Sequence, residues 1–265
     1  MNAPPVGLYS IGIRSLDAGE LILVASTANV PFIHLRGGPK GYDLARVPPP
    51  QIDAWARQAR HAAPITVVTA DTDASAFLSA QDGHHPQASA ELDALATAAA
   101  RLGAQSVRLL SRVVPSPAQR STPSLPDLRA SHGLLTLIEL HDPAWFDPDA
   151  IDWLYALLDR SPGVALLLDS HQVHAAWELD PHPGWPGVLE GLARRARVAH
   201  LSDPGTGLEG AGHRLTAHAL LTAASDGRRI EVAFEWTGPD RSPATCLARY
   251  RDAADWWNHM WARYP

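Results

Sequence analysis

Short apolar runs rich in β-branched residues alternate along the chain with longer segments in which alanine, leucine and arginine recur at helical spacing. The apolar runs predict eight strands whose centres lie about 24 to 41 residues apart, close to the length of a βαβ repeat. The predicted strands are residues 8–12, 31–36, 65–70, 106–111, 134–140, 164–169, 198–201 and 230–236. The predicted helices are residues 50–61, 88–102, 149–160, 187–195, 216–224 and 242–263.

Eight such units in one chain favour a (β/α)8 TIM barrel over a doubly wound sheet. We expect a single domain over residues 1–265, with residues 1–5 as a loose tail. Residues 112–132 are rich in proline and serine, so they predict an extended loop in place of a barrel helix, or a mobile flap. The aromatic-rich C-terminal segment predicts a final helix that packs on the barrel or on a neighbouring subunit.

The composition excludes several classes of protein. Apolar residues make up 46% of the 265 residues, so the chain can build a large core. A net charge of -6 without any basic run argues against a nucleic-acid partner. No segment is apolar over the length of a membrane span, and the single cysteine, Cys246, cannot form an internal disulfide, so we expect a cytoplasmic protein. Lys40 is the only lysine, and its Gly-rich surroundings argue against a lysine-imine mechanism.

Four potential metal ligands stand at the ends of four consecutive predicted strands. They are Glu139, Asp169, His200 and Glu235, spaced by 30, 31 and 35 residues. The ends of barrel strands meet on one face, and three carboxylates gathered there need a cation. Oxygen-rich ligation with one imidazole suits Mn²⁺ first, with Mg²⁺, Co²⁺ or Zn²⁺ as alternatives. Taken singly, each residue has a simpler explanation as a helix cap, a loop residue or a core histidine.

The motifs around these residues resemble the xylose isomerase-like TIM-barrel superfamily of sugar (phosphate) isomerases and epimerases. The resemblance lies in the segments at residues 139–142, 167–171, 200–203, 209–212 and 234–236, so it covers about residues 130–240. It implies that Glu139, Asp169, His200 and Glu235 bind one divalent metal ion. His34 stands where the family more often has Glu, and Gln172 stands where many members have His.

The resemblance implies a metal-dependent isomerase or epimerase of a sugar or related polyhydroxy carbonyl compound, a role in carbohydrate metabolism. Proton transfer would pass through a metal-stabilised enediolate, with Glu139 and Glu235 as the acid/base pair. Two alternatives stay open. The same enediolate can expel a hydroxyl, as in an inosose dehydratase-like lyase, and the barrel can be a noncatalytic subunit. The segment at residues 211–213 lacks the Asp-x-His pair of endonuclease IV, which argues against DNA repair.

Four further residues are candidates for contact with a small sugar-like substrate. Arg36 is suited to a carboxylate, phosphate or hydroxyl, or else it pairs with a barrel carboxylate. His141 and His171 follow their neighbouring ligands by two residues, which returns them to the same face if the strand continues. Asp203 can orient His200, bind substrate or hold a turn. For the assembly, we keep a homodimer open.

Overall fold

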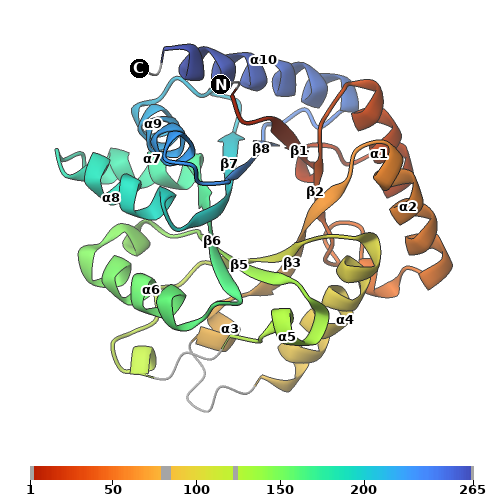
Figure 1. Cartoon of the computed structure of the whole chain (residues 1–265), viewed down its shortest axis with the longest axis horizontal. Helices are drawn as coiled ribbons and strands as arrows, with labels where there is room; N and C mark the ends of the chain where they lie inside the picture. The colour runs from red at the N-terminus through yellow and green to blue at the C-terminus, as the bar shows by residue number, and fades with distance from the viewer. Residues whose placement is uncertain (1–2, 79–84, 122–124, 264–265) are drawn as a thin grey trace.

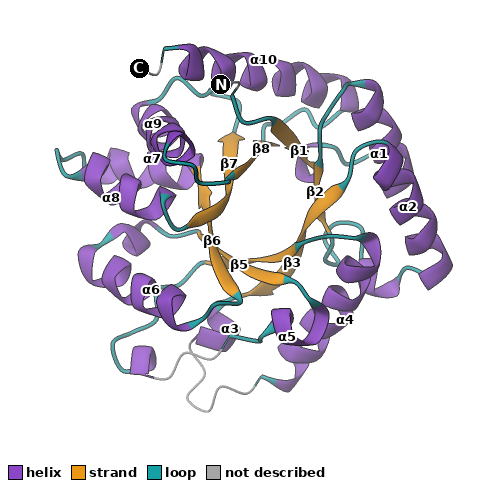
Figure 2. Ribbon diagram, in the orientation of Figure 1, coloured by secondary structure: helices purple, strands orange, loops and turns teal. Residues whose placement is uncertain are grey.

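Eight parallel strands form a closed barrel in the order in which they occur in the chain (Figure 1). The computed structural model describes residues 3–78, 85–121 and 125–263. Helices surround the barrel on its outside, so the predicted (β/α)8 architecture is confirmed (Figure 2). The strands are β1 (Val6–Tyr9), β2 (Ile33–Arg36), β3 (Ile65–Asp73), β4 (Ser106–Ser111), β5 (Leu135–Leu140), β6 (Val164–Asp169), β7 (Ala196–Asp203) and β8 (Glu231–Trp236).

All six predicted helices are present, and four further α-helices were not predicted. The α-helices are α1 (Ala18–Thr27), α2 (Pro49–His61), α3 (Ser75–Leu78), α4 (Pro86–Leu102), α5 (Leu128–His132), α6 (Pro148–Arg160), α7 (Ser170–Leu179), α8 (Trp185–Ala193), α9 (Ala211–Ser225) and α10 (Pro243–Ala262). Short 3-10 turns are η1 (Ser10–Gly12), η2 (Leu44–Arg46), η3 (Gln119–Ser121) and η4 (Pro143–Phe146). The predicted stop of α4 is confirmed, because Gly103 follows it in the left-handed conformation with φ +86°.

The first strand begins two residues and ends three residues earlier than predicted. β1 ends at Tyr9, and the segment assigned to its second half turns as η1. The side chain of Ser10 accepts a hydrogen bond from the backbone N–H of Arg36 at 2.8 Å, which fixes this turn against the end of β2. In the observed strand, the Tyr9 side chain lies inside the barrel, where its ring stacks on that of His200.

Strand β6 does not continue past Asp169, because α7 begins at the next residue. The Oδ1 atom of Asp169 accepts hydrogen bonds from the backbone N–H groups of His171 (2.8 Å) and Gln172 (3.0 Å) and so caps the helix. His171 therefore lies on the first turn of a helix, and the continued strand that would align it with Asp169 is not present.

The Pro/Ser-rich segment at residues 112–132 is mostly loop, but its last five residues form α5. Asp127 caps that helix, and Gly133 ends it with φ +72°. The prediction of a loop to residue 132 was wrong there, although both capping residues stand in the sequence. Residues 122–124 of this segment lie outside the described part, and the alternative of a flap stays a prediction.

Two hydrogen bonds join the beginning of the chain to helix α10. The indole Nε1 of Trp257 on α10 donates to the carbonyl of Pro4 at 3.0 Å, and the hydroxyl of Tyr250 donates to the carbonyl of Val6 at 2.7 Å. Of the tail predicted at residues 1–5, residues 1 and 2 lie outside the described part, and Pro4 is held by α10. None of the described helices is long and apolar enough to cross a membrane.

A separate apolar cluster fills part of the barrel interior. It consists of Val67, Leu137, Leu167 and Val198, one residue from each of β3, β5, β6 and β7, and all are buried. Leu137 precedes Glu139 by two residues on the same face of β5, so this cluster supports the functional site from below. The close packing of these aliphatic side chains restricts movement of the strands that hold the site.

The substitution Leu137→Ala is expected to lower the free energy of unfolding by about 2–5 kcal/mol, because it leaves a cavity that the closed barrel cannot collapse to fill. Urea unfolding followed by tryptophan fluorescence measures the loss. The exposed Leu179 on α7 provides the matched control, and Leu179→Ala should have a much smaller effect. Equal losses in the two variants would contradict the packed interior.

Candidate metal centre

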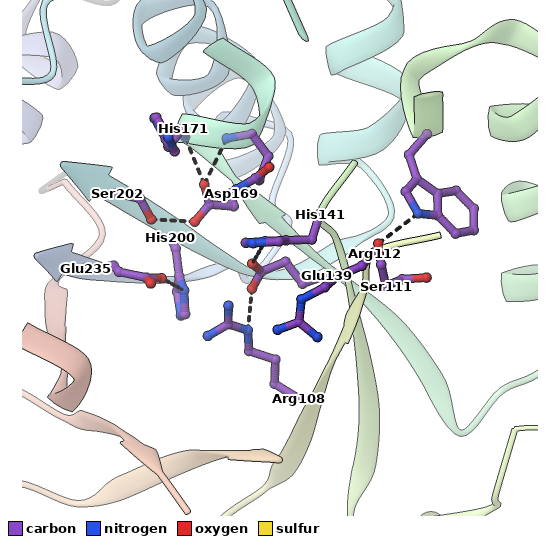
Figure 3. A network of polar contacts seen from close by, with 12 residues as sticks. Arg108, Ser111, Arg112, Glu139, His141, Asp169, His171, His200, Ser202 and Glu235 are labelled. Atoms are coloured by element: carbon purple, nitrogen blue, oxygen red, sulfur yellow. Dashed lines mark hydrogen bonds and ion pairs between the residues drawn. The ribbon is translucent and has the colours of Figure 1, made fainter. Parts of the chain in front are cut away.

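Three of the four predicted ligands converge at the carboxyl ends of β5, β6 and β7. One potential ligand atom from each of Glu139, Asp169 and His200 lies within 4.8 Å of the other two. All three residues are buried, with Asp169 the most exposed at 4%. Among the residues that the structure describes, this is the one such group of histidine, cysteine and acidic side chains. Figure 3 shows their side chains directed toward one another inside the barrel.

Glu235 on β8 joins the group through the imidazole of His200. Its Oε2 lies 2.8 Å from Nδ1 of His200, and the residue is 6% exposed. The second nitrogen of His200, Nε2, faces away from Glu235 toward His34 on β2. Glu235 thus adds a third buried carboxylate to the site (Figure 3).

A buried arginine that sequence analysis missed lies against the same group. Arg108 in the middle of β4 is 3% exposed, and its guanidinium forms an ion pair with Oε2 of Glu139. It also lies 5.1 Å from the ring centroid of Tyr9. Among the described residues, Arg108 is the only buried arginine or lysine. One fixed positive charge therefore faces three carboxylates.

The pKa values of the carboxylates reflect this imbalance. Burial alone would raise the pKa of Glu139, but Arg108 and His141 lower it to about 2. Burial, followed by the charges of Glu139 and Glu235, raises the pKa of Asp169 to about 7. Burial also raises the pKa of Glu235, against the charge of Arg108. Without a further cation, Glu139 is held ionised, whereas burial and the neighbouring negative charges stabilise the protonated forms of Asp169 and Glu235 more than water does.

A hydrogen-bonded chain crosses the barrel interior behind His200. Nδ1 of His34 lies 2.8 Å from Nε2 of His200, and Nε2 of His34 lies 2.7 Å from Oε1 of Glu231. Glu231 stands at the start of β8, at the opposite end of the barrel from Glu235, and it accepts a further bond from Oγ1 of Thr66. The chain thus links Glu231, His34, His200 and Glu235.

These contacts define the tautomer of His200. Burial alone would raise the pKa of Glu231, but its interactions with His34 lower it, so the carboxylate accepts a hydrogen bond from the Nε2–H of His34. Burial lowers the pKa of His34, which leaves the imidazole neutral with Nδ1 as an acceptor. Nδ1 of His34 therefore accepts the N–H of Nε2 in His200. The Nδ1 atom of His200 keeps its lone pair, directed at Glu235.

The candidate substrate residues fall into two groups. His141 lies beside the carboxylates, with Nδ1 3.2 Å from Oε1 of Glu139, whose bond raises the pKa of the imidazole. Arg36 closes β2, and one of its nitrogens lies 3.3 Å from Oδ1 of Asp71, so the pairing with a barrel carboxylate is present. Both side chains stay partly exposed, His141 at 34% and Arg36 at 22%, so each can still contact a substrate.

The hydrogen bonds and ring contacts of His171 and Asp203 are with residues outside the group of proposed ligands. His171 is the second residue of α7, its ring stacks on that of His213 at 6.5 Å, and its Nδ1 has no hydrogen-bond partner among the described residues. The Oδ1 of Asp203 accepts hydrogen bonds from the N–H groups of Gly205 (2.7 Å) and Gly207 (2.8 Å). Asp203 therefore holds a turn, and its contact with substrate stays a prediction.

Sequence analysis missed Arg108 and Glu231 because they lie away from the carboxyl ends of their strands, and it missed Tyr9 and Ser202, which lie at such ends, because they are neither acidic nor histidine. Arg108 stands in the middle of the run Ser106–Ser111, where an arginine among apolar residues is itself a signal. The hydroxyl of Ser202 donates to Oδ2 of Asp169. Glu231 was assigned no role because it lies at the amino end of its strand.

The donor set fits a divalent cation. Three carboxylates and one imidazole nitrogen with a free lone pair match the oxygen and nitrogen ligands of Mn²⁺, Mg²⁺, Co²⁺ or Zn²⁺. A divalent ion would supply the positive charge that Arg108 alone does not provide for Asp169 and Glu235. The second-sphere chain to His34 and Glu231 is also the kind of support that metal-binding histidines receive.

Comparison with solved structures shows the same architecture in sugar-modifying proteins. 3-keto-D-glucoside 4-epimerase from E. coli aligns with a TM-score of 0.64 and 14% identity over 97% of this chain and 99% of that one. D-psicose 3-epimerase aligns with 0.65 and 11% over 97% of each chain. The IOLI protein with a bound zinc atom aligns with 0.68 and 12% over 98% of this chain and 99% of that one. The chain has the xylose isomerase-like TIM-barrel fold.

No protein-family model matches the sequence. No curated protein matches it either. The likeness to the xylose isomerase-like barrels therefore rests on the three-dimensional structure, and identities of 11–14% establish the fold alone. The xylose isomerase-like fold places the candidate metal centre at the face where barrel enzymes carry their chemistry.

Proposed function

We propose that this xylose isomerase-like barrel is a divalent-metal-dependent isomerase or epimerase of a sugar or related polyhydroxy carbonyl compound. The observation that carries the proposal is the buried group of Glu139, Asp169 and His200, joined by Glu235. The epimerases among the structural neighbours support the same class of reaction. A small molecule with adjacent hydroxyl and carbonyl oxygens is the substrate that suits this site.

The proposed ligands are carboxylate oxygens of Glu139, Asp169 and Glu235 and the Nδ1 atom of His200. Mn²⁺ is our first choice because oxygen ligands dominate, and neighbours with bound zinc and magnesium keep those ions as alternatives. Both oxygens of Glu139 now have partners in Arg108 and His141. Each of these oxygens has a second lone pair, so Glu139 could bind the ion and keep both partners.

The bound cation would polarise the substrate carbonyl and stabilise negative charge on its oxygen. The protein's own residues then move the proton. Glu235, whose pKa is raised by burial, would carry a proton to and from the substrate carbon. Glu139 is held ionised by Arg108 and serves on the other side of the site. His141 and Arg36 would bind substrate oxygens, and His171 and Asp203 remain predicted contacts.

The proposal also includes the cellular location and the oligomeric state of the protein. The single cysteine, Cys246, is buried and unpaired, which fits the reducing cytoplasm as the location. A homodimer stays a prediction. Both would accompany a role in carbohydrate metabolism.

Metal analysis and proton exchange test the proposal together. The purified protein should bind about one divalent ion per chain, and incubation with ketoses in deuterated water should yield epimers or isomers labelled at the carbon next to the carbonyl. Products that absorb as enones, without labelled isomers, would replace the isomerase with the dehydratase. Absence of metal binding on titration would leave the noncatalytic barrel.

The His200 tautomer gives a separate prediction. His34→Phe removes the acceptor of the His200 Nε2 proton and is expected to weaken divalent-metal affinity about 10- to 100-fold. His34→Gln, whose side-chain carbonyl can accept the same proton, should retain more affinity. Calorimetric titration measures both, and ¹⁵N spectra of His200 report the tautomer. If His34→Phe binds the metal ion with wild-type affinity, the hydrogen bond from His200 to His34 does not support metal binding.

A further inference from the structure

A cavity of about 490 Å³ lies between the turn after β1 and the Gly-rich segment after β2. Its lining includes the side chains of Arg14, Arg36 and Lys40, and Lys40 is the only lysine of the chain. None of the described residues that line this cavity is acidic. Three cations around one cavity are notable in a protein with a net charge of -6.

A fourth cation borders the same cavity. The guanidinium of Arg241 donates to the carbonyl of the lining residue Ile11 at 3.2 Å, and also to the carbonyls of Thr237 and Gly238. These partners are neutral backbone groups, so they hold Arg241 in place without balancing its charge. Burial, followed by the charges of Arg14 and Arg36, lowers the pKa of Arg241, which agrees with crowding of the three guanidinium groups.

The nearby carboxylates balance only part of this charge. Asp71 lies 3.3 Å from a nitrogen of Arg36 through Oδ1, and its Oδ2 accepts the backbone N–H of Lys40 at 2.6 Å. Asp17 and Glu20 raise the pKa of Tyr42 after the larger effect of burial, but they bond to each other's backbone as the cap of α1. The side chains of Arg14 and Lys40 have no ion-pair partner among the described residues.

The cavity lies at the carboxyl ends of β1 and β2, two strands whose residues Tyr9 and His34 contact His200. Arg36 stands two residues after His34, which contacts His200, and the charge of Glu235 acts on Arg241. Tyr9, whose ring stacks on His200, directly precedes Ser10 in the cavity lining. A substrate whose carbonyl end lies between Glu139 and Glu235 can therefore extend its other end toward these cations.

From this placement, we propose that the cavity formed by Arg14, Arg36 and Lys40, with Arg241 at its edge, binds an anionic group of the substrate. The inference rests on the proposed isomerase or epimerase and narrows its substrate to a sugar or polyol derivative that carries a phosphate or a carboxylate. Charge-assisted hydrogen bonds from arginine to such groups are short and directional. The negative charge of a bound phosphate or carboxylate balances the positive charge of the arginine and lysine side chains that Asp71 leaves unbalanced.

Titration of inorganic phosphate into the full-length protein, in metal-depleted buffer, tests the cavity without relying on turnover. Arg14→Gln/Lys40→Gln is expected to weaken phosphate binding about tenfold or more, because two cations are lost. Arg60→Gln/Arg251→Gln removes the same charge from exposed positions on α2 and α10 and should bind phosphate as the wild type does. Lack of saturable binding to the wild type, or equal affinity in both double variants, would overturn the proposal.

Kinetics then distinguish the two kinds of anion. A neutral ketose, its terminal phosphate ester and the corresponding sugar acid are compared as substrates for deuterium exchange. The KM of one anionic form should be about tenfold or more below that of the neutral ketose, and the Arg14→Gln/Lys40→Gln variant should reduce this preference. An equal or lower KM for the neutral ketose would refute the anionic substrate. Exchange with no compound, together with saturable phosphate binding, would instead refute the proposed isomerase and leave the cavity as an anion site.

Discussion

Replacement of Glu235 by glutamine is expected to lower the rate of substrate proton exchange about 10²- to 10⁴-fold. Glutamine preserves the size of the side chain, and its amide N–H can still donate to Nδ1 of His200, the contact that Glu235 makes at 2.8 Å. The variant loses the carboxylate that carries the proton. The structure around His200 should therefore persist while exchange fails.

The rate should be measured in deuterated water at saturating metal concentration, because Glu235 is also a proposed ligand. Glu178 on α7, whose side chain is 64% exposed, provides the matched control, and Glu178→Gln should exchange protons at the wild-type rate. If Glu235→Gln keeps full activity with bound metal, Glu235 does not carry the proton.

Replacement of Arg108 by methionine is expected to lower the free energy of unfolding of the metal-free protein by about 3–5 kcal/mol. The substitution leaves Glu139 buried with no full positive charge beside it, next to Asp169 and Glu235. Urea unfolding measures the loss. The double variant Arg108→Met/Glu139→Gln should recover much of it, because the isolated charge is then also removed.

A divalent ion should partly restore the stability of Arg108→Met, because it supplies the missing charge to the same carboxylates. Arg101 provides the control, since its ion pair with Asp53 lies on the surface. Arg101→Met should destabilise the protein far less. A loss in Arg108→Met as small as that in Arg101→Met would show that Glu139 does not depend on Arg108.

The barrel could be predicted because its strands carry their own signal. Strand β6 was placed at its observed bounds, since the run Val164–Asp169 is apolar up to its terminal aspartate. Helix α1 was missed because residues 21–25 in its middle form a continuous apolar run, a pattern that is compatible with a strand or a helix. Its start was still marked by Asp17 and Glu20, which form a capping box.

The candidate site was predicted in part for a similar reason. Strand ends converge in any barrel, so Glu139, Asp169 and His200 could be brought together from position alone. The interior partners could not, because His34 reaches His200 and Glu231 across 166 and 197 residues of sequence. Such contacts depend on the register of the closed barrel, which no local pattern specifies.

The most direct test of the central claim is the anomalous diffraction of crystals soaked in Mn²⁺. The account predicts one anomalous peak inside the barrel, at about 2.0–2.3 Å from carboxylate oxygens of Glu139, Asp169 and Glu235 and from Nδ1 of His200. A structure in which these four side chains bind no ion at saturating Mn²⁺, with Arg108 still paired to Glu139, would contradict it.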